Sequence, residues 1–173
     1  MPAISGPSQF FTCTGVSVAQ RPQLAGTILY DVIKPVTMGG TPSDTTWNMQ
    51  FRVVRSTKTG LLDFYWRVVS PISLPAGVRF FASGFNLYFN KPLTITYADY
   101  RTDGLGSNPP SRIQMGAGIW MNKLINFQFL SNDFRPGSRF IFASTQATNF
   151  TPNGGESDTL YVSGQYATIP GPA

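Results

Sequence analysis

The chain has 173 residues, of which 42% are hydrophobic and only 12% are charged, and its net charge is +5. This length fits one domain that buries a core of its own. The chain contains no histidine and a single cysteine, which excludes a Ser-His-Asp or Cys-His catalytic group, a zinc site built from Cys and His, and an intrachain disulfide. We therefore expect a protein that is not an enzyme and that holds no cofactor.

The positive charge is too thinly spread to predict a nucleic-acid partner. The densest basic cluster is Arg52, Arg55 and Lys58, whereas a nucleic-acid surface usually carries a dense basic stripe with aromatic rings for stacking. No run is long and apolar enough to predict a membrane span. The opening residues Met1–Ala3 lack the basic and apolar regions that begin a signal peptide.

The first 20 residues are nearly free of charge and contain the strand-like run Phe10–Val18. Two interpretations remain open for this segment. It is either an ordinary first strand of the same domain, or a strand that adds to the sheet of a neighbouring subunit and thereby builds a filament. The residues predicted to make such an assembly contact are Phe10, Phe11, Cys13, Val16 and Val18.

Apolar and polar residues alternate from Trp47 to Val53 and again from Leu62 to Val68. A period of two is typical of a strand with one buried face. Ser56–Gly60 between them predicts a hairpin turn, so we expect the two strands to pair antiparallel. The residues expected to share one core face are Trp47, Phe51, Phe64 and Trp66.

Seven further strands are expected, separated by turns that hold most of the 14 prolines and 17 glycines. They are Thr27–Ile33, Val78–Phe89, Leu93–Tyr100, Ile113–Trp120, Ile125–Leu130, Arg139–Ser144 and Thr159–Thr168. No segment of ten or more residues has the 3.6-residue period of a helix. The pattern predicts an all-β fold, a single-domain antiparallel β-sandwich of jelly-roll type spanning residues 1–173, with residues 1–20 as an arm or exchanged strand.

One loop suggests a metal site. Asp99 and Asp103 lie close together ahead of Gly104, and carboxylates spaced in this way can bind calcium, which takes six to eight oxygen ligands. Arg101 lies between them and would repel the ion. The alternative interpretation is a polar turn with an Asp–Arg pair, and this is the one we favour.

Aromatic residues make up 14% of the chain, and a row of them on a sandwich face can stack on sugar rings. By strand parity the outward-facing rings are expected to be those of Tyr65, Tyr88 and Tyr100. The alternative is that these rings serve core and cross-strand packing, as aromatic side chains more often do.

Several segments resemble exported bacterial proteins that carry PEP-CTERM or related choice-of-anchor sorting tails. The similar segments, in the same order along the chain, are Ala25–Leu29, Val53–Val68, Tyr97–Gly104, Asn126–Phe129, Arg135–Ser138 and Ala143–Thr151. The resemblance implies secretion and a β-rich ectodomain, and it implies no catalytic residues. Two features depart from that pattern, because the sorting tail is absent and Arg139 stands where the resembled turn has glutamate.

These observations lead to one expected function and two alternatives. We expect a non-enzymatic extracellular or cell-surface structural protein that acts by self-association, as the subunit of a surface layer, matrix or filament. The alternatives are a carbohydrate-binding module, whose partner would be a polysaccharide, and a viral capsid or fibre protein. Under the first expectation the partner is a second copy of the chain, in a homo-oligomer or filament.

Overall fold

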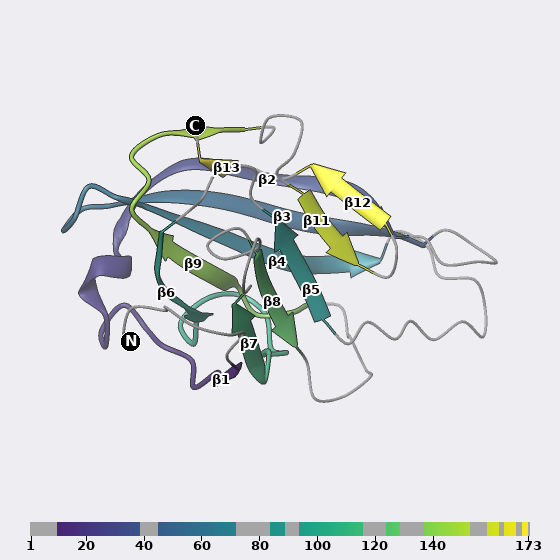
Figure 1. The fold of residues 1–173 in the computed structure, drawn as a ribbon, viewed down its shortest axis with the longest axis horizontal. Helices are drawn as coiled ribbons and strands as arrows, with labels where there is room; N and C mark the ends of the chain where they lie inside the picture. The colour runs from purple at the N-terminus through teal and green to yellow at the C-terminus, as the bar shows by residue number, and fades with distance from the viewer. Residues whose placement is uncertain are drawn as a thin grey trace.

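The computed structural model describes residues 10–38, 45–71, 84–88, 94–115, 124–128, 137–152, 159–162, 165–168 and 171–172. Within these ranges the chain folds into a five-stranded and a six-stranded antiparallel sheet that pack face to face, with a separate two-stranded ladder (Figure 1). The predicted all-β sandwich is confirmed. The only helix in the described part is one 3-10 turn, Pro22–Leu24, and no described helix is long and apolar enough to cross a membrane.

The five-stranded sheet is built around the predicted hairpin. Its strands, in spatial order, are β2 (Gly26–Met38), β3 (Thr45–Ser56), β4 (Leu62–Pro71), β9 (Ile141–Thr145) and β6 (Ile95–Tyr100). The register places Phe51 opposite Trp66 and Val53 opposite Phe64, as the alternation predicts. Gly60 closes the turn with φ of +73°, a conformation that glycine adopts without a steric cost.

The six-stranded sheet brings together segments that are distant in sequence. Its strands, in spatial order, are β1 (Phe10–Thr12), β7 (Arg112–Met115), β8 (Leu124–Gln128), β5 (Gly84–Tyr88), β11 (Thr159–Val162) and β12 (Gln165–Thr168). Strand β1 pairs with β7, and β5 pairs with β11, so the connections cross between sheets as in a jelly-roll-like sandwich. The small ladder joins β10 (Phe150–Thr151) and β13 (Gly171–Pro172).

Two predicted strands differ from the observed ones. The segment Thr159–Thr168 is not one strand but the hairpin of β11 and β12, closed by the pair Val162 and Gln165. A two-residue connection keeps the period of two in phase, so the pattern alone does not separate a long strand from a tight hairpin. The segment Phe10–Val18 is a strand only as far as Thr12. The predicted positions 78–83, 89, 116–120 and 129–130 lie outside the described residues.

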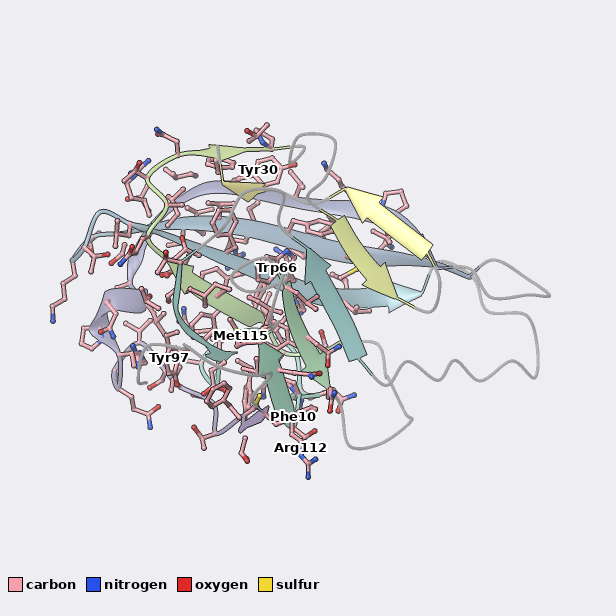
Figure 2. The ribbon with its side chains drawn as sticks, viewed as in Figure 1. Phe10, Tyr30, Trp66, Tyr97, Arg112 and Met115 are labelled. Carbon is pink, nitrogen blue, oxygen red and sulfur yellow. The ribbon has the colours of Figure 1, made fainter. Side chains whose placement is uncertain are left out.

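The main core lies between the two sheets. Phe51, Phe64 and Trp66 come from the five-stranded sheet, Ile125 and Phe127 come from the six-stranded sheet, and all five are at most 1% exposed. In Figure 2 the side chains of Trp66 and Met115 lie between the sheets, whereas Phe10 lies at the lower edge of the molecule. Each large apolar side chain buried in this way contributes about 1.5–3 kcal/mol, so this cluster holds the sheets together.

The outer face of the five-stranded sheet carries a second, smaller cluster. Val16 and Leu24 of the N-terminal segment pack there against Tyr65 and Phe142, which lie on the sheet. The rings of Tyr65 and Phe142 are stacked with centroids 5.4 Å apart. Strand β4 is therefore buried on both faces, which explains why Leu62–Val68 is rich in apolar and aromatic residues at both parities.

Candidate functional site

The N-terminal segment crosses from one sheet to the other and is bound by backbone hydrogen bonds at three points. The Cys13 N–H donates to the Ser111 carbonyl at 2.9 Å. Beyond it, the Val16 N–H donates to the Tyr100 carbonyl and the Thr102 N–H donates to the Val16 carbonyl, both at 3.0 Å. The segment thus begins as the edge strand of the six-stranded sheet and continues over the outer face of the five-stranded sheet.

Asp99 fastens this segment to strand β6. Its carboxylate is buried, with the residue 3% exposed, and accepts hydrogen bonds from the Gly15 N–H at 3.1 Å and the Tyr97 hydroxyl at 2.9 Å. It also accepts one from the Tyr100 N–H at 2.9 Å. A carboxylate with several donors is a strong acceptor, so Asp99 holds the turn at Gly15 in place.

Asp103 makes a second attachment nearby, at the surface. It accepts the Val18 N–H at 2.8 Å and forms an ion pair with Arg101, whose Nε lies 2.7 Å from the carboxylate. The hydrogen bond from Arg101 lowers the pKa of Asp103 below its usual value, against an opposing effect of burial. The Asp–Arg pair that the sequence suggested as the alternative to a calcium site is therefore present.

Calcium binding by Asp99 and Asp103 stays a prediction without structural support. The carboxylates are occupied by the N–H, O–H and guanidinium donors just described. The described part of the chain contains no group of three or more His, Cys, Asp or Glu side chains placed to hold a metal ion. Since calcium takes six to eight oxygens, two carboxylates in this setting are a poor start.

The five predicted assembly residues divide into buried and exposed ones. Phe11 and Cys13 pack against the main core, and Val16 and Val18 pack against the second cluster, all within the same chain. Phe10 is 56% exposed. The first of the two interpretations, an ordinary first strand, is the arrangement seen in this single chain. Exchange of the strand between subunits stays a prediction.

Cys13 is an inert thiol in this arrangement. Burial, reinforced by the negative charge of Asp99, raises the pKa of the Cys13 thiol to about 12. The thiol is therefore protonated at neutral pH, and only the thiolate is a strong nucleophile. Cys13 acts as a small apolar side chain under the N-terminal segment.

The exposed edges of the two sheets differ in character. Strand β2 carries Ile28, Leu29 and Ile33, which are 51%, 39% and 54% exposed. It also has a bulge between Ile28 and Tyr30 and a proline, Pro35, and both features interrupt further strand pairing. Strand β1 at the edge of the other sheet has neither a charged residue nor a proline. Its edge is therefore the less protected one.

The three tyrosines predicted to face outward form no described row. Tyr65 is only 2% exposed because Phe140, Phe142 and the N-terminal segment cover it, so the prediction that it faces solvent is wrong. Tyr100 is half-buried against the main core. The side chain of Tyr88 lies outside the described ones, although its backbone is part of β5. Sheet parity failed for Tyr65 because it assumes that one face of the sheet is wet.

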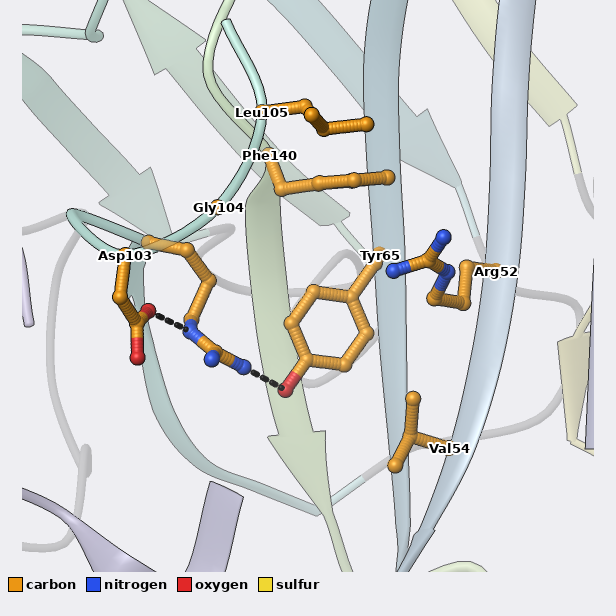
Figure 3. A pocket seen from close by; sticks show the side chains of 8 residues that line it. Arg52, Val54, Tyr65, Asp103, Gly104, Leu105 and Phe140 are labelled. Carbon is orange, nitrogen blue, oxygen red and sulfur yellow. Dashed lines mark hydrogen bonds and ion pairs between the residues drawn. The ribbon is translucent and has the colours of Figure 1, made fainter. Parts of the chain in front are cut away.

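A pocket that the sequence did not suggest lies on the same outer face. It has a volume of about 290 Å³ and is named here the arginine pocket (Figure 3). Its lining residues are Arg52, Val54, Tyr65, Arg101, Asp103, Gly104, Leu105 and Phe140. Arg52 comes from β3, Tyr65 from β4, and Arg101 and Leu105 from the segment after β6, so the pocket depends on the whole sheet.

Arginines and aromatic rings alternate around the arginine pocket. The Arg52 and Arg67 guanidinium carbons lie 4.7 and 5.3 Å from the centroid of the Phe140 ring, distances at which cations are attracted to aromatic rings. Arg101 donates to the Tyr65 hydroxyl at 3.4 Å. Burial, and the positive charge of Arg52, lower the pKa of Arg67, which reports repulsion between guanidinium groups.

A second hollow, of about 420 Å³, surrounds the carboxylate of Asp63. Asp63 is 4% exposed, and its Oδ2 has no hydrogen-bond partner among the described residues. Burial raises the pKa of Asp63 to about 6, although Ser144, Arg101 and Arg21 act in the opposite direction. Arg21 and Lys58 line the same hollow, so this carboxylate lies near cations without a printed ion pair to either.

Part of the arginine pocket could have been found from the sequence. The predicted hairpin places Arg52 and Arg67 on the face opposite the main core, and the register sets Arg52 opposite Tyr65. Phe140 and Arg101 are brought there by strands β9 and β6, which pair with each other. No local pattern predicts that pairing.

Comparison of the chain with protein-family models, with curated proteins and with solved structures found no match in any of the three. The resemblance to exported bacterial proteins with sorting tails therefore stays a prediction.

Proposed function

We propose that this chain is a non-enzymatic structural protein of the cell exterior that acts by self-association through the edge strands of its two sheets. The observation that carries this proposal is the exposure of large apolar side chains on edge strands, Phe10 on β1 and Ile28 and Ile33 on β2. Exposed apolar area of this kind is common at interfaces between protein chains.

The position of these edges favours an open assembly. Figure 1 places β1 at the bottom of the view and β2 at the top, so the two edges lie on opposite sides of the sandwich. Contact between unlike edges of successive copies is heterologous, and it continues into a filament unless the rotation closes a ring. Strand β1 is the better template for strand addition, because β2 carries a bulge and Pro35.

The composition supports the other parts of the proposal. The absence of histidine and the low charged fraction of 12% favour function by shape and contact over proton transfer, which usually depends on histidine or a tuned carboxylate. The location outside the cell follows from the resemblance to exported proteins and is proposed on that ground alone.

Sedimentation velocity over a range of protein concentrations tests the proposal. We expect the native chain to form species larger than a monomer, and Phe10→Ser to weaken the association at least about tenfold, because burying a Phe side chain contributes about 1.5–3 kcal/mol. Leu105→Ser is the matched control, since Leu105 is also 56% exposed but lies outside the strands. A native chain that sediments as a monomer at all concentrations, or equal effects of the two substitutions, would contradict the proposal.

A further inference from the structure

We propose that the arginine pocket is a binding site for a sugar ring that bears a carboxylate, such as a uronic acid unit. This inference goes beyond self-association and does not depend on it, because the pocket lies on the outer face of the five-stranded sheet and contains none of the exposed edge residues. Three features of the pocket carry the inference.

The first feature is an excess of positive charge. Arg52, Arg67 and Arg101 surround the arginine pocket, against the two carboxylates of Asp31 and Asp103, which pair with Arg52 and Arg101 at 2.7 Å each. Three guanidinium groups facing two carboxylates leave room for one more negative charge. A guanidinium binds a carboxylate through two parallel hydrogen bonds, so an oxyanion is the group that fits best.

The second feature is an unsatisfied donor. The Nε of Arg52 is buried and has no hydrogen-bond partner among the described residues, although the same side chain donates from Nη2 to Asp31. A buried donor without a partner costs about 1–3 kcal/mol. Such groups occur where a ligand, ion or water completes the structure.

The third feature is the aromatic lining, which distinguishes a sugar acid from a free anion. Tyr65 and Phe140 meet at 88° with centroids 6.1 Å apart, so the pocket has one wall formed by a ring face and another formed by a ring edge. The Tyr65 hydroxyl accepts from Arg101 and keeps its own proton for a second bond. Leu105, 56% exposed, forms the apolar rim.

The dimensions set the ligand size. A volume of about 290 Å³ lies at the lower end of the range for small-molecule pockets, roughly 300–1,000 Å³. The arginine pocket therefore takes a single ring with its charged substituent, in contrast to an extended row of rings. This is the reason to expect recognition of one acidic unit of a polysaccharide.

Isothermal titration calorimetry with sodium glucuronate as the probe tests the proposal, with glucose, sodium acetate and inorganic phosphate as comparison probes. We expect glucuronate to bind at least about tenfold more tightly than glucose, because glucose lacks the charge-assisted hydrogen bonds. Acetate and phosphate supply the charge without the ring and should also bind at least about tenfold more weakly. The affinity for glucuronate should fall as salt rises.

Variants assign the binding to this pocket. Arg52→Gln should weaken glucuronate binding at least about tenfold, whereas Arg55→Gln should leave it within about twofold. Arg55 lies on the same strand but donates to the Gly60 and Thr148 carbonyls. Leu105→Ala removes an exposed side chain and serves as a second pocket variant, expected to weaken binding about threefold, if Arg52→Gln fails to fold.

Four results would overturn the proposal. They are no detectable binding of glucuronate, glucose binding as tightly as glucuronate, acetate or phosphate binding as tightly as glucuronate, and equal losses in Arg52→Gln and Arg55→Gln. Because the titration is read on the dissolved chain whether or not it associates, failure here leaves the self-association result unaffected, and the reverse also holds.

Discussion

The buried carboxylate of Asp99 accepts a hydrogen bond from the backbone N–H of Gly15, which lies 84 residues earlier in the chain. This contact joins the N-terminal segment to strand β6 at the point where the segment passes from one sheet to the other. It also explains why the loop around Asp99 carries acidic residues without a metal ion, because their acceptors are filled by N–H groups of the chain itself. The first four predictions start from this region and from the buried groups near it.

Replacing Asp99 should detach the N-terminal segment. Asp99→Ala leaves the Gly15 and Tyr100 N–H groups without their acceptor, and we expect it to lower the free energy of unfolding by about 2–4 kcal/mol. Urea denaturation followed by fluorescence measures this change. Asp31→Ala is the control, because Asp31 forms a surface ion pair with Arg52 whose loss should cost about 1 kcal/mol or less. Equal losses in both variants would show that Asp99 is not an anchor.

Gly15 should tolerate no side chain. It has φ of +71°, and a Cβ at this position would lie 2.4 Å from Cζ of Tyr100. Gly15→Ala should therefore lower the free energy of unfolding by about 3 kcal/mol or more, the sum of backbone strain and a displaced ring. Gly60→Ala is the matched control: its φ is +73° but nothing lies within 4 Å of its Cβ, so only about 1 kcal/mol is expected. A small effect at Gly15 would mean that the turn does not pack on Tyr100.

Asp63 should make the protein less stable as the pH rises. Burial raises the pKa of Asp63 from 3.8 to about 6 in the folded state, so the folded chain binds this proton more tightly than the unfolded chain. The resulting stabilisation is complete below about pH 4 and is lost as the pH rises through about 6. It amounts to about 3 kcal/mol.

Asp63→Asn tests this effect, because the amide cannot ionise. The variant should gain stability relative to the native chain between pH 4 and pH 8 by about 3 kcal/mol, as measured by urea denaturation at each pH. Asp31→Asn, at a surface ion pair, should show no gain of this kind. A difference between Asp63→Asn and the native chain that stays constant across this pH range would contradict the burial of an ionisable Asp63.

Cys13 should react slowly with thiol reagents in the folded protein. Burial and the charge of Asp99 raise the pKa of the Cys13 thiol from 9.0 to about 12, so the thiolate fraction at pH 8 falls about a thousandfold. Reaction with a disulfide reagent, timed in native buffer and in concentrated urea, measures the difference. Comparable rates in the two conditions would show that the N-terminal segment does not cover Cys13 in solution.

The central hairpin could be predicted from the sequence because its information is local. Alternation fixes which face of β3 and β4 is buried, and the turn at Ser56–Gly60 fixes the register, so Phe51, Phe64 and Trp66 were all assigned to the core that they occupy. The prediction failed where a distant segment intervenes. Tyr65 has the parity of an outward residue, yet the N-terminal segment covers it.

The candidate sites depend on such distant contacts even more strongly. Asp99 and Asp103 were singled out correctly as unusual carboxylates, but their partners Gly15 and Val18 lie more than 80 residues away. The sequence alone therefore suggested a metal where the structure has N–H donors. The arginine pocket was missed for the same reason, since the pairing of β9 with β4 and β6 creates it.

Electron microscopy of the purified full-length chain in negative stain tests self-association most directly. Copies joined by unlike sheet edges should appear as filaments or extended oligomers, and Phe10→Ser should shorten or abolish them while Leu105→Ser leaves them intact. A field of single, unassociated particles for the native chain at high protein concentration would contradict the account.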